Sequence, residues 1–185
     1  MIWFTSDTHF GHERIIELCN RPFDSTAEMN AALIDNWNSV VSDGDTVFHM
    51  GDAVMGSFAE NVQILGQLNG QIHLIPGNHD RVSKAYHHKN PAAYYRFEQM
   101  YLDQGVIIHE EIDGLPIGGQ WITMSHYPFT DERYPQLCPE DVGQWLIHGH
   151  VHDEWQVNGR QINVGTDVWN YTPISILDIL EIIGL

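Results

Sequence analysis

Short clusters of metal-ligand side chains recur along the chain, each beside a residue that favours a turn. They contain aspartate, histidine and asparagine, whose oxygens and nitrogens suit a pair of hard to borderline divalent cations. A single Asp-x-His or His-x-His pair is weak support for a metal site, because most histidines of globular proteins have other roles. Their recurrence predicts an active-site layout. The clusters are Ser6-Asp7-Thr8-His9, Gly51-Asp52, Gly77-Asn78-His79-Asp80, Ser125-His126 and Gly149-His150-Val151-His152.

Each cluster follows a run of residues that is typical of a β-strand, and these runs are 2–5, 46–50, 71–75, 120–124 and 144–147. The ends of strands are held rigidly and open onto the crevice where open α/β sheets bind their ligands. Side chains two apart on a strand point to the same face, so we expect Asp7 and His9 to hold one metal. By the same geometry, His150 and His152 can offer imidazoles to two adjacent metals. Asp52 has two carboxylate oxygens and can bridge two metals about 3.5–4 Å apart.

Between the first three of these strand-like runs, apolar residues recur at helical spacing. This spacing predicts helices over 11–20, with Leu18 among the inward residues, over 26–41, with Thr26 as the N-cap, and over 57–68. Beyond about residue 105 strands follow one another, and residues 153–157 and 160–164 flank Asn158-Gly159, a hairpin signal. Residues 174–183 fit a strand or a short amphipathic helix. We therefore predict an α/β fold with a mixed sheet, in one domain spanning residues 1–185.

The composition restricts the partners of such a site. With 185 residues, of which 43% are hydrophobic and 18% charged, the chain is typical of a folded globular protein. Its net charge of −17 disfavours anionic membranes and long nucleic acid as partners, because both require a cationic surface. A small phosphorylated substrate remains compatible, since charges are screened over about 8 Å at physiological salt. The oligomeric state stays open.

The two cysteines, Cys19 and Cys138, lie far apart and form no Cys-x-x-Cys pair. Neither a disulfide framework nor a thiolate zinc site is indicated, which favours a reducing compartment. The first residues contain no signal-peptide pattern, and no apolar stretch approaches the roughly 18 to 20 residues of a membrane-spanning helix. We expect a cytoplasmic protein.

In order and type, the clusters resemble the motifs of the calcineurin-like metallophosphoesterase superfamily: Asp-x-His, Gly-Asp, Gly-Asn-His-Asp/Glu, His and Gly-His-x-His. The resemblance runs from Asp7 to His152. Residues 4–12, 21–23 and 36–38 are further similar to small bacterial and phage members described only as phosphoesterases or phosphohydrolases. The resemblance implies the superfamily's fold, a four-layer α-β-β-α sandwich of two mixed sheets.

The resemblance also implies the ligand sets. Two divalent ions, Mn²⁺ first with Fe, Zn²⁺ or Ni²⁺ as alternatives, would share one carboxylate. His79 would assist the leaving group while a metal-bridging hydroxide attacks phosphorus in line. One metal would be held by Asp7, His9, Asp52 and His152, and the other by Asp52, Asn78, His126 and His150.

Substrate contacts are predicted outside these motifs. His12 follows the first cluster, and Arg81 belongs to a basic stretch with Lys84, Lys89 and Arg96. A packed, solvated helix face explains that stretch equally well. Arg133 lies on residues 127–143, a long loop expected to overhang the crevice as a lid or specificity element.

These features predict a phosphodiesterase acting on small or nucleotide-like esters in preference to a monoesterase. A protein phosphatase is disfavoured, because the residues after Asp52 do not form the Asp-Arg-Gly element of that branch. The first alternative is a non-catalytic scaffold with the same fold, and the second is a nuclease acting on longer nucleic acid. The partner that orients His79 is left unassigned, with Asp80 either involved or capping the following helix.

Overall fold

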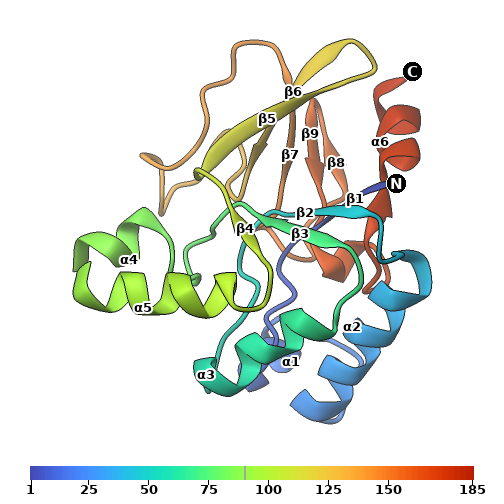
Figure 1. The fold of residues 1–185 in the computed structure, drawn as a ribbon. Helices are drawn as coiled ribbons and strands as arrows, with labels where there is room; N and C mark the ends of the chain where they lie inside the picture. The colour runs from blue at the N-terminus through green and yellow to red at the C-terminus, as the bar shows by residue number, and fades with distance from the viewer. Residues whose placement is uncertain (90) are drawn as a thin grey trace.

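The computed structural model describes residues 1–89 and 91–185, apart from the side chains of Ala85, His88 and Lys89. The predicted contributions of Lys89 therefore lie outside the described residues. Two five-stranded sheets stack on one another (Figure 1). The first has the order β10-β1-β2-β3-β4 and the second β5-β6-β7-β9-β8. The strands of the first sheet are β1 (Ile2–Thr5), β2 (Thr46–His49), β3 (Gln71–Leu74), β4 (Ile107–Ile108) and β10 (Ile174–Ser175).

Both sheets are mixed. In the first, β1 to β4 are parallel and β10 is antiparallel to β1. In the second, β6, β7 and β9 are parallel, with antiparallel strands at both edges. This confirms the predicted α/β fold of two mixed sheets with flanking helices. The strands of the second sheet are β5 (Ile112–Ile117), β6 (Gln120–Ser125), β7 (Trp145–His148), β8 (Val157–Asn158) and β9 (Gln161–Asn163).

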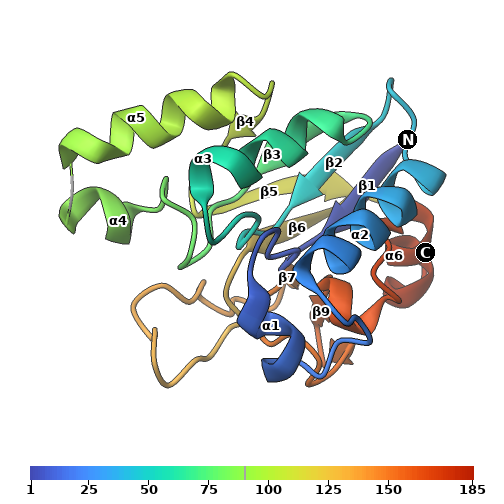
Figure 2. The same ribbon diagram turned by 90° about the horizontal axis from the view of Figure 1, so that it is seen from below.

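Two hydrophobic cores lie on opposite faces of the first sheet. Alternation along β2 sends Val47 into the core beneath the helices and Phe48 toward the core between the sheets. Figure 2 shows α2 and α3 lying across the first sheet. The helices are α1 (Glu13–Leu18), α2 (Thr26–Val40), α3 (Phe58–Asn61), the 3₁₀ helix η1 (Val62–Gln67), α4 (Lys84–Lys89), α5 (Pro91–Leu102) and α6 (Ile176–Ile183); a 3₁₀ turn, η2, spans Thr166–Val168.

The helices of the structure differ from the predicted ones in three details. The inward assignment of Leu18 is wrong, because the helix is short and this side chain is 63% exposed, whereas Ile15 is buried. The N-cap of α2 is Ser25, whose hydroxyl accepts a hydrogen bond from the Glu28 N–H, and Thr26 is the first helical residue. The segment predicted as one helix over 57–68 divides into α3 and η1.

Two further elements, the hairpin and the C-terminal segment, differ only locally from the prediction. The hairpin pairs Asn158 with Gln161, so its two loop residues are Gly159 and Arg160, one position later than predicted. The ambiguous C-terminal segment contains both alternatives, a short strand and then α6, which Ser175 and Asp178 cap reciprocally. Ile179 of α6 packs into the core between the sheets. Among the described residues, no helix has the length and apolarity to cross a membrane.

Replacing the observed cap of α2 should destabilise the protein more than replacing its neighbour. Ser25→Ala leaves the Glu28 N–H without its acceptor and is expected to lower the free energy of unfolding by about 1 kcal/mol. Thr26→Ala is the matched control, with little or no loss because alanine has the better helix propensity. Urea denaturation of both variants measures the difference, and a larger loss for Thr26→Ala would contradict the assignment.

Candidate metal centre

The predicted clusters meet because of the strand order. β1, β2 and β3 are neighbouring parallel strands, so the loops after Thr5, His49 and Leu74 emerge at one edge of the first sheet. β6 and β7 are also parallel neighbours, so the loops after Ser125 and His148 emerge together from the second sheet. A hydrogen bond from the His150 N–H to Asp7 Oδ2, at 2.9 Å, joins the two groups of loops.

The backbone that presents these side chains is left-handed. The φ angles are 55° at Asp7, 49° at His9, 56° at Asp52, 72° at His150 and 48° at His152. The predicted strand alternation at Asp7 and His9, and at His150 and His152, is therefore wrong, because these residues lie beyond the strands in left-handed backbone. Non-glycine residues rarely adopt this conformation, and such residues concentrate at functional sites.

Two glycines permit the close approach of the loops. Gly51 has φ of +89°, and a side chain there would collide with the backbone of Gly77 in the next ligand loop. A side chain at Gly149 would collide with Ser6 and with the Asp7 carboxylate. The ligand-bearing loops therefore touch at positions where only hydrogen fits.

The Asp52 carboxylate lies at the centre of the assembled side chains. Its Oδ2 is 3.7 Å from His9 Nε2, 3.6 Å from His126 Nε2 and 3.9 Å from His79 Nε2. Its Oδ1 accepts a 2.8 Å hydrogen bond from the His79 N–H. Asp52 thus fixes the loop that carries His79 while its other oxygen faces three imidazoles.

The other side chains form two groups around Asp52. On one side, Asp7 Oδ1 lies 3.9 Å from His9 Nε2 and 4.0 Å from His152 Nε2. On the other side, His126 Nε2 lies 3.0 Å from Asn78 Oδ1 and 3.2 Å from His150 Nδ1. The structure thereby brings together all the predicted ligands, in the two groups that the resemblance implied.

Unsatisfied buried atoms show that this donor set fits cations. Asp7 Oδ1 and His9 Nε2 are buried and have no hydrogen-bond partner among the described residues. Leaving such groups unpaired is costly, and a cation between them would satisfy both. The ligand atoms of Asp7, His9 and His152 lie within 4.8 Å of one another, as do those of Asp7, Asp52 and His126.

The pKa values of the side chains at the centre also indicate a site for cations. Burial would raise the pKa of Asp7, but the imidazoles of His152, His126 and His9 outweigh it and the pKa lies below its ordinary value. Burial, followed by the nearby Asp80 carboxylate, raises the pKa of Asp52 well above its ordinary value. Burial also lowers the pKa of His9, which keeps its imidazole in the neutral form that binds metals.

Asp80 has a structural role that the sequence did not reveal. Its Oδ2 accepts hydrogen bonds from the N–H groups of Asp52, at 2.6 Å, and Gly77, at 2.9 Å. Its Oδ1 accepts from the Ala53 N–H at 3.1 Å and the Tyr101 hydroxyl at 2.9 Å. The alternative of a helix cap is wrong, because this buried carboxylate joins two ligand loops to α5.

Arg21 and Asp167 form a second buried support that the sequence did not reveal. The Arg21 guanidinium donates to both Asp167 carboxylate oxygens, from Nε at 2.7 Å and from Nη2 at 2.9 Å. It also donates to the backbone carbonyls of Asp7, at 2.7 Å, and Thr8, at 3.1 Å. The left-handed turn at the first ligand cluster is therefore held by a charged side chain.

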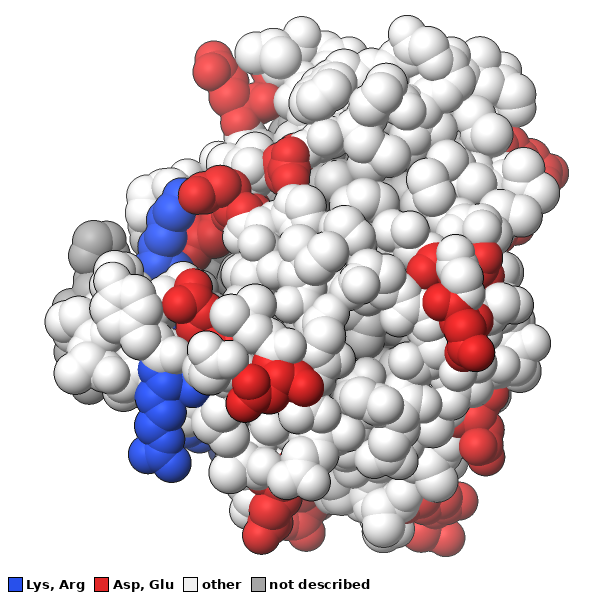
Figure 3. Space-filling view, viewed as in Figure 1, with Lys and Arg blue, Asp and Glu red and all other residues white. Residues whose placement is uncertain are grey.

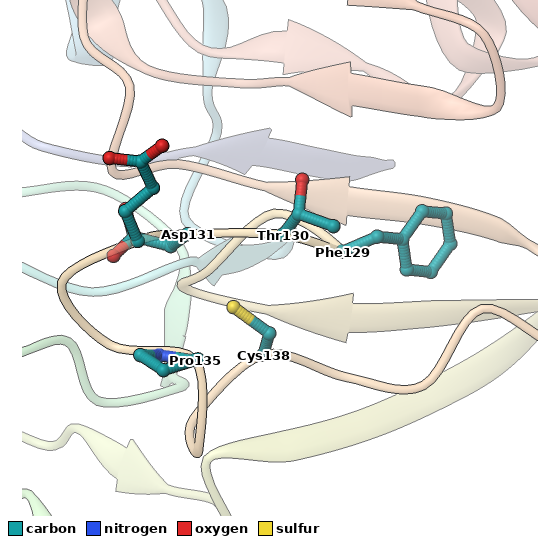
Figure 4. A pocket seen from close by; sticks show the side chains of 6 residues that line it. Phe129, Thr130, Asp131, Pro135 and Cys138 are labelled. Atoms are coloured by element: carbon teal, nitrogen blue, oxygen red, sulfur yellow. The ribbon is translucent and has the colours of Figure 1, made fainter.

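A cavity of about 280 Å³ opens beside the centre. Arg133, predicted as a substrate contact, lines it together with Tyr134, so the overhanging loop lies where we expected. The lining residues are Asp52, Asn78, His79, Asp131, Arg133, Tyr134, His150 and His152. A second hollow, of about 490 Å³, lies along the same loop, and Phe129 and Cys138 are among its lining residues (Figure 4).

The other predicted substrate contacts lie outside the cavity lining. The Arg81 guanidinium lies 4.9 Å from the ring centroid of Phe58 and 4.5 Å from that of Phe97, a packing role. Lys84 pairs with Glu110 at 2.6 Å. His12 lies beside the centre, with its ring 5.3 Å from the His9 ring. Substrate binding by His12 and Arg81 remains a prediction.

Comparison with known proteins identifies the family. Residues 1–170 match the model of the calcineurin-like phosphoesterase superfamily domain. The chain belongs to this superfamily. Phosphoesterase is therefore the class of activity to which its site corresponds, and the clustered metal ligands agree with the divalent metals that the family binds.

Similar proteins come from several sources. An uncharacterized protein of Methanocaldococcus jannaschii is 34% identical, with 98% of this chain and 90% of that protein covered. The gene 66 protein of Mycobacterium phage L5 is 34% identical, with 90% of this chain and 86% of that protein covered. A crystal structure of a protein of unknown function from Aquifex aeolicus is 28% identical, covers 98% of both chains and superposes with a TM-score of 0.73.

Metal binding should stabilise the folded protein. Adding Mn²⁺ at about 100 times its dissociation constant to EDTA-stripped protein is expected to raise the free energy of unfolding by about 2.7 kcal/mol for each ion bound, or Tm by about 5–10 °C per ion. His9→Ala should greatly reduce this shift because it removes a ligand of the centre. His79→Ala, which exchanges the same residue type beside the centre, should retain it. Thermal melts test this, and an equal shift in all three proteins would count against the assignment.

Proposed function

We propose that this protein is a dinuclear metal-dependent phosphohydrolase, and more narrowly a phosphodiesterase acting on small or nucleotide-like phosphate esters. The position of Asp52 carries the proposal. Its Oδ2 lies between His9 Nε2, at 3.7 Å, and His126 Nε2, at 3.6 Å, which belong to different ligand groups. A carboxylate shared in this way is the element that two adjacent cations require.

The two ligand groups assign the remaining side chains. Asp7, His9 and His152 would hold one ion, and Asn78, His126 and His150 the other, with Asp52 common to both. Ions bound there would activate a water molecule for in-line attack on phosphorus and neutralise charge on the phosphoryl oxygens. Mn²⁺ is the ion we propose, and Fe, Zn²⁺ and Ni²⁺ suit the same mixed oxygen and nitrogen donors.

His79 is the proposed general acid. Its side chain is 45% exposed and lines the cavity, whereas Asp52 beside it is 2% exposed. The 2.8 Å hydrogen bond from its N–H to Asp52 Oδ1 fixes its backbone and leaves the ring free to face a substrate. An imidazole so placed can donate a proton to the departing ester oxygen.

The surroundings of the cavity support a small diester as substrate. Arg133 is exposed and lines both the central cavity and a neighbouring hollow of about 470 Å³, so its guanidinium can meet a phosphate while the hollow accepts a second ester arm. Figure 3 shows acidic side chains scattered over one face, with the cationic ones gathered toward α4 and α5. The scarcity of cationic residues, 8 Lys and Arg against 25 Asp and Glu, disfavours a nuclease acting on long nucleic acid.

A non-catalytic scaffold remains the alternative from another class. It is disfavoured because the described centre contains every predicted ligand and also His79, and a scaffold requires neither. A cytoplasmic location is part of the proposal and rests on the two free cysteines.

Loss of the proposed acid should affect turnover and leave metal binding intact. His79→Ala is expected to lower kcat for a diester by about 10²–10⁴-fold, because the leaving oxygen loses its proton donor. The effect should shrink with a chromogenic ester whose leaving group departs as a stable anion. Steady-state kinetics on a poor and a good leaving group provide the measurement, and an equal loss on both would contradict the role.

The reaction class has its own test. Metal-stripped protein is reloaded with Mn²⁺, Zn²⁺, Mg²⁺ or Ni²⁺ and assayed with a diester and a monoester of the same chromogenic alcohol. We expect hydrolysis with Mn²⁺, faster for the diester, and its abolition in Asp52→Ala. If no metal restores turnover, the enzyme hypothesis is rejected in favour of the scaffold alternative. If the monoester is hydrolysed faster than the diester, the protein is a phosphomonoesterase and the diesterase proposal is wrong.

A further inference from the structure

Two histidines of the Gly149–His152 turn use their two ring nitrogens differently. His152 turns Nε2 toward Asp7 Oδ1, at 4.0 Å, and Nδ1 toward Asp167 Oδ2, at 3.2 Å. His150 turns Nδ1 toward His126 Nε2, at 3.2 Å, and Nε2 toward Asp131 Oδ2, at 3.1 Å. A carboxylate on the nitrogen that faces away from a metal fixes the tautomer and the orientation of the ring.

These two supporting carboxylates are anchored in different ways. Asp167 is 1% exposed and paired through both oxygens with Arg21, which makes it part of the rigid core. Asp131 is 18% exposed and belongs to the loop between β6 and β7. The orientation of His150 therefore depends on a loop, whereas that of His152 depends on a buried ion pair.

Asp131 also shapes the part of the loop that faces the substrate. Its Oδ1 accepts hydrogen bonds from the N–H groups of Arg133, at 2.8 Å, and Tyr134, at 2.6 Å. Both of these residues line the central cavity. Asp131 lines that cavity and both neighbouring hollows, including the one in Figure 4. One carboxylate therefore contacts a metal ligand through one oxygen and builds the turn that presents Arg133 through the other.

We propose that Asp131 is a positioning residue that couples the loop carrying Arg133 to the metal site at His150. The inference rests on the proposed function, because it assumes that His150 holds a metal. A phosphate that binds Arg133 would stabilise the turn and, through Asp131, the His150 ring. By linkage, a metal bound at His150 strengthens phosphate binding by the same factor.

The test measures Mn²⁺ binding to metal-stripped protein by calorimetry, with and without inorganic phosphate. Asp131→Asn keeps an oxygen for the two N–H groups and removes the charge beside His150. We expect it to weaken Mn²⁺ binding at one of the two sites by about 10-fold and to reduce its enhancement by phosphate. A merely structural role would weaken folding without removing the enhancement.

Glu132→Gln is the matched control. It removes the same charge from the neighbouring position of the same loop, and Glu132 lines the outer hollows without lining the central cavity. This variant should bind Mn²⁺ as the wild type does and retain the enhancement by phosphate. An equal weakening in Glu132→Gln would assign the effect to general charge and overturn the inference.

Arg133→Ala completes the comparison. It should leave Mn²⁺ binding in the absence of phosphate unchanged while reducing the enhancement, and it should raise KM more than it lowers kcat. If the wild type binds two Mn²⁺ and hydrolyses a diester, but Asp131→Asn binds and responds to phosphate as the wild type does, the coupling is wrong and the proposed function stands. A wild type that binds none of Mn²⁺, Zn²⁺ and Ni²⁺ overturns both.

Discussion

The structure depends on holding two buried carboxylates, Asp7 and Asp52, against the same group of imidazoles. Each carboxylate has left water, and an isolated buried charge is strongly unfavourable. The opposite directions of their pKa changes show the conflict, since imidazoles lower that of Asp7 while burial and Asp80 raise that of Asp52. Cations between them resolve it. The arrangement is therefore stable as a ligand set and unfavourable as an empty one.

Meeting this constraint requires left-handed backbone at residues other than glycine, which disfavour that conformation. Each left-handed non-glycine residue costs on the order of 1–3 kcal/mol, and the turns at Asp7, Asp52 and His150 all contain one. The surrounding structure offsets this cost with charged groups aimed at the backbone. Asp80 accepts the N–H of Asp52, and Arg21 donates to the carbonyl of Asp7. The sheets bring the loops together, and these buried polar groups keep the turns closed.

The sequence predicts the content of the site better than its support. The ligand clusters were recognisable because each is a short motif after a strand, and the chain brings them together as expected. The backbone conformation of these clusters was not predictable, since a two-residue spacing such as that of Asp7 and His9 fits a strand or a turn. Arg21 and Asp167 are 146 positions apart, so neither has a local signal that names its partner. The cap of α2 was misplaced because Ser25 and Thr26 are both competent caps.

Charge would allow so acidic a protein to recruit the anionic ester of the proposed function. Two divalent ions would bring four positive charges to a centre whose ionised ligands, Asp7 and Asp52, bring two negative ones, and Arg133 adds a positive charge at the edge of the same cavity. Most of the acidic side chains behind the net charge of −17 lie outside the lining of this cavity, and salt screens charges over about 8 Å. A substrate larger than the cavity would meet the acidic surface along most of its length. Under the proposed function, a small ester would meet chiefly the cationic centre, so the charge distribution would favour small substrates.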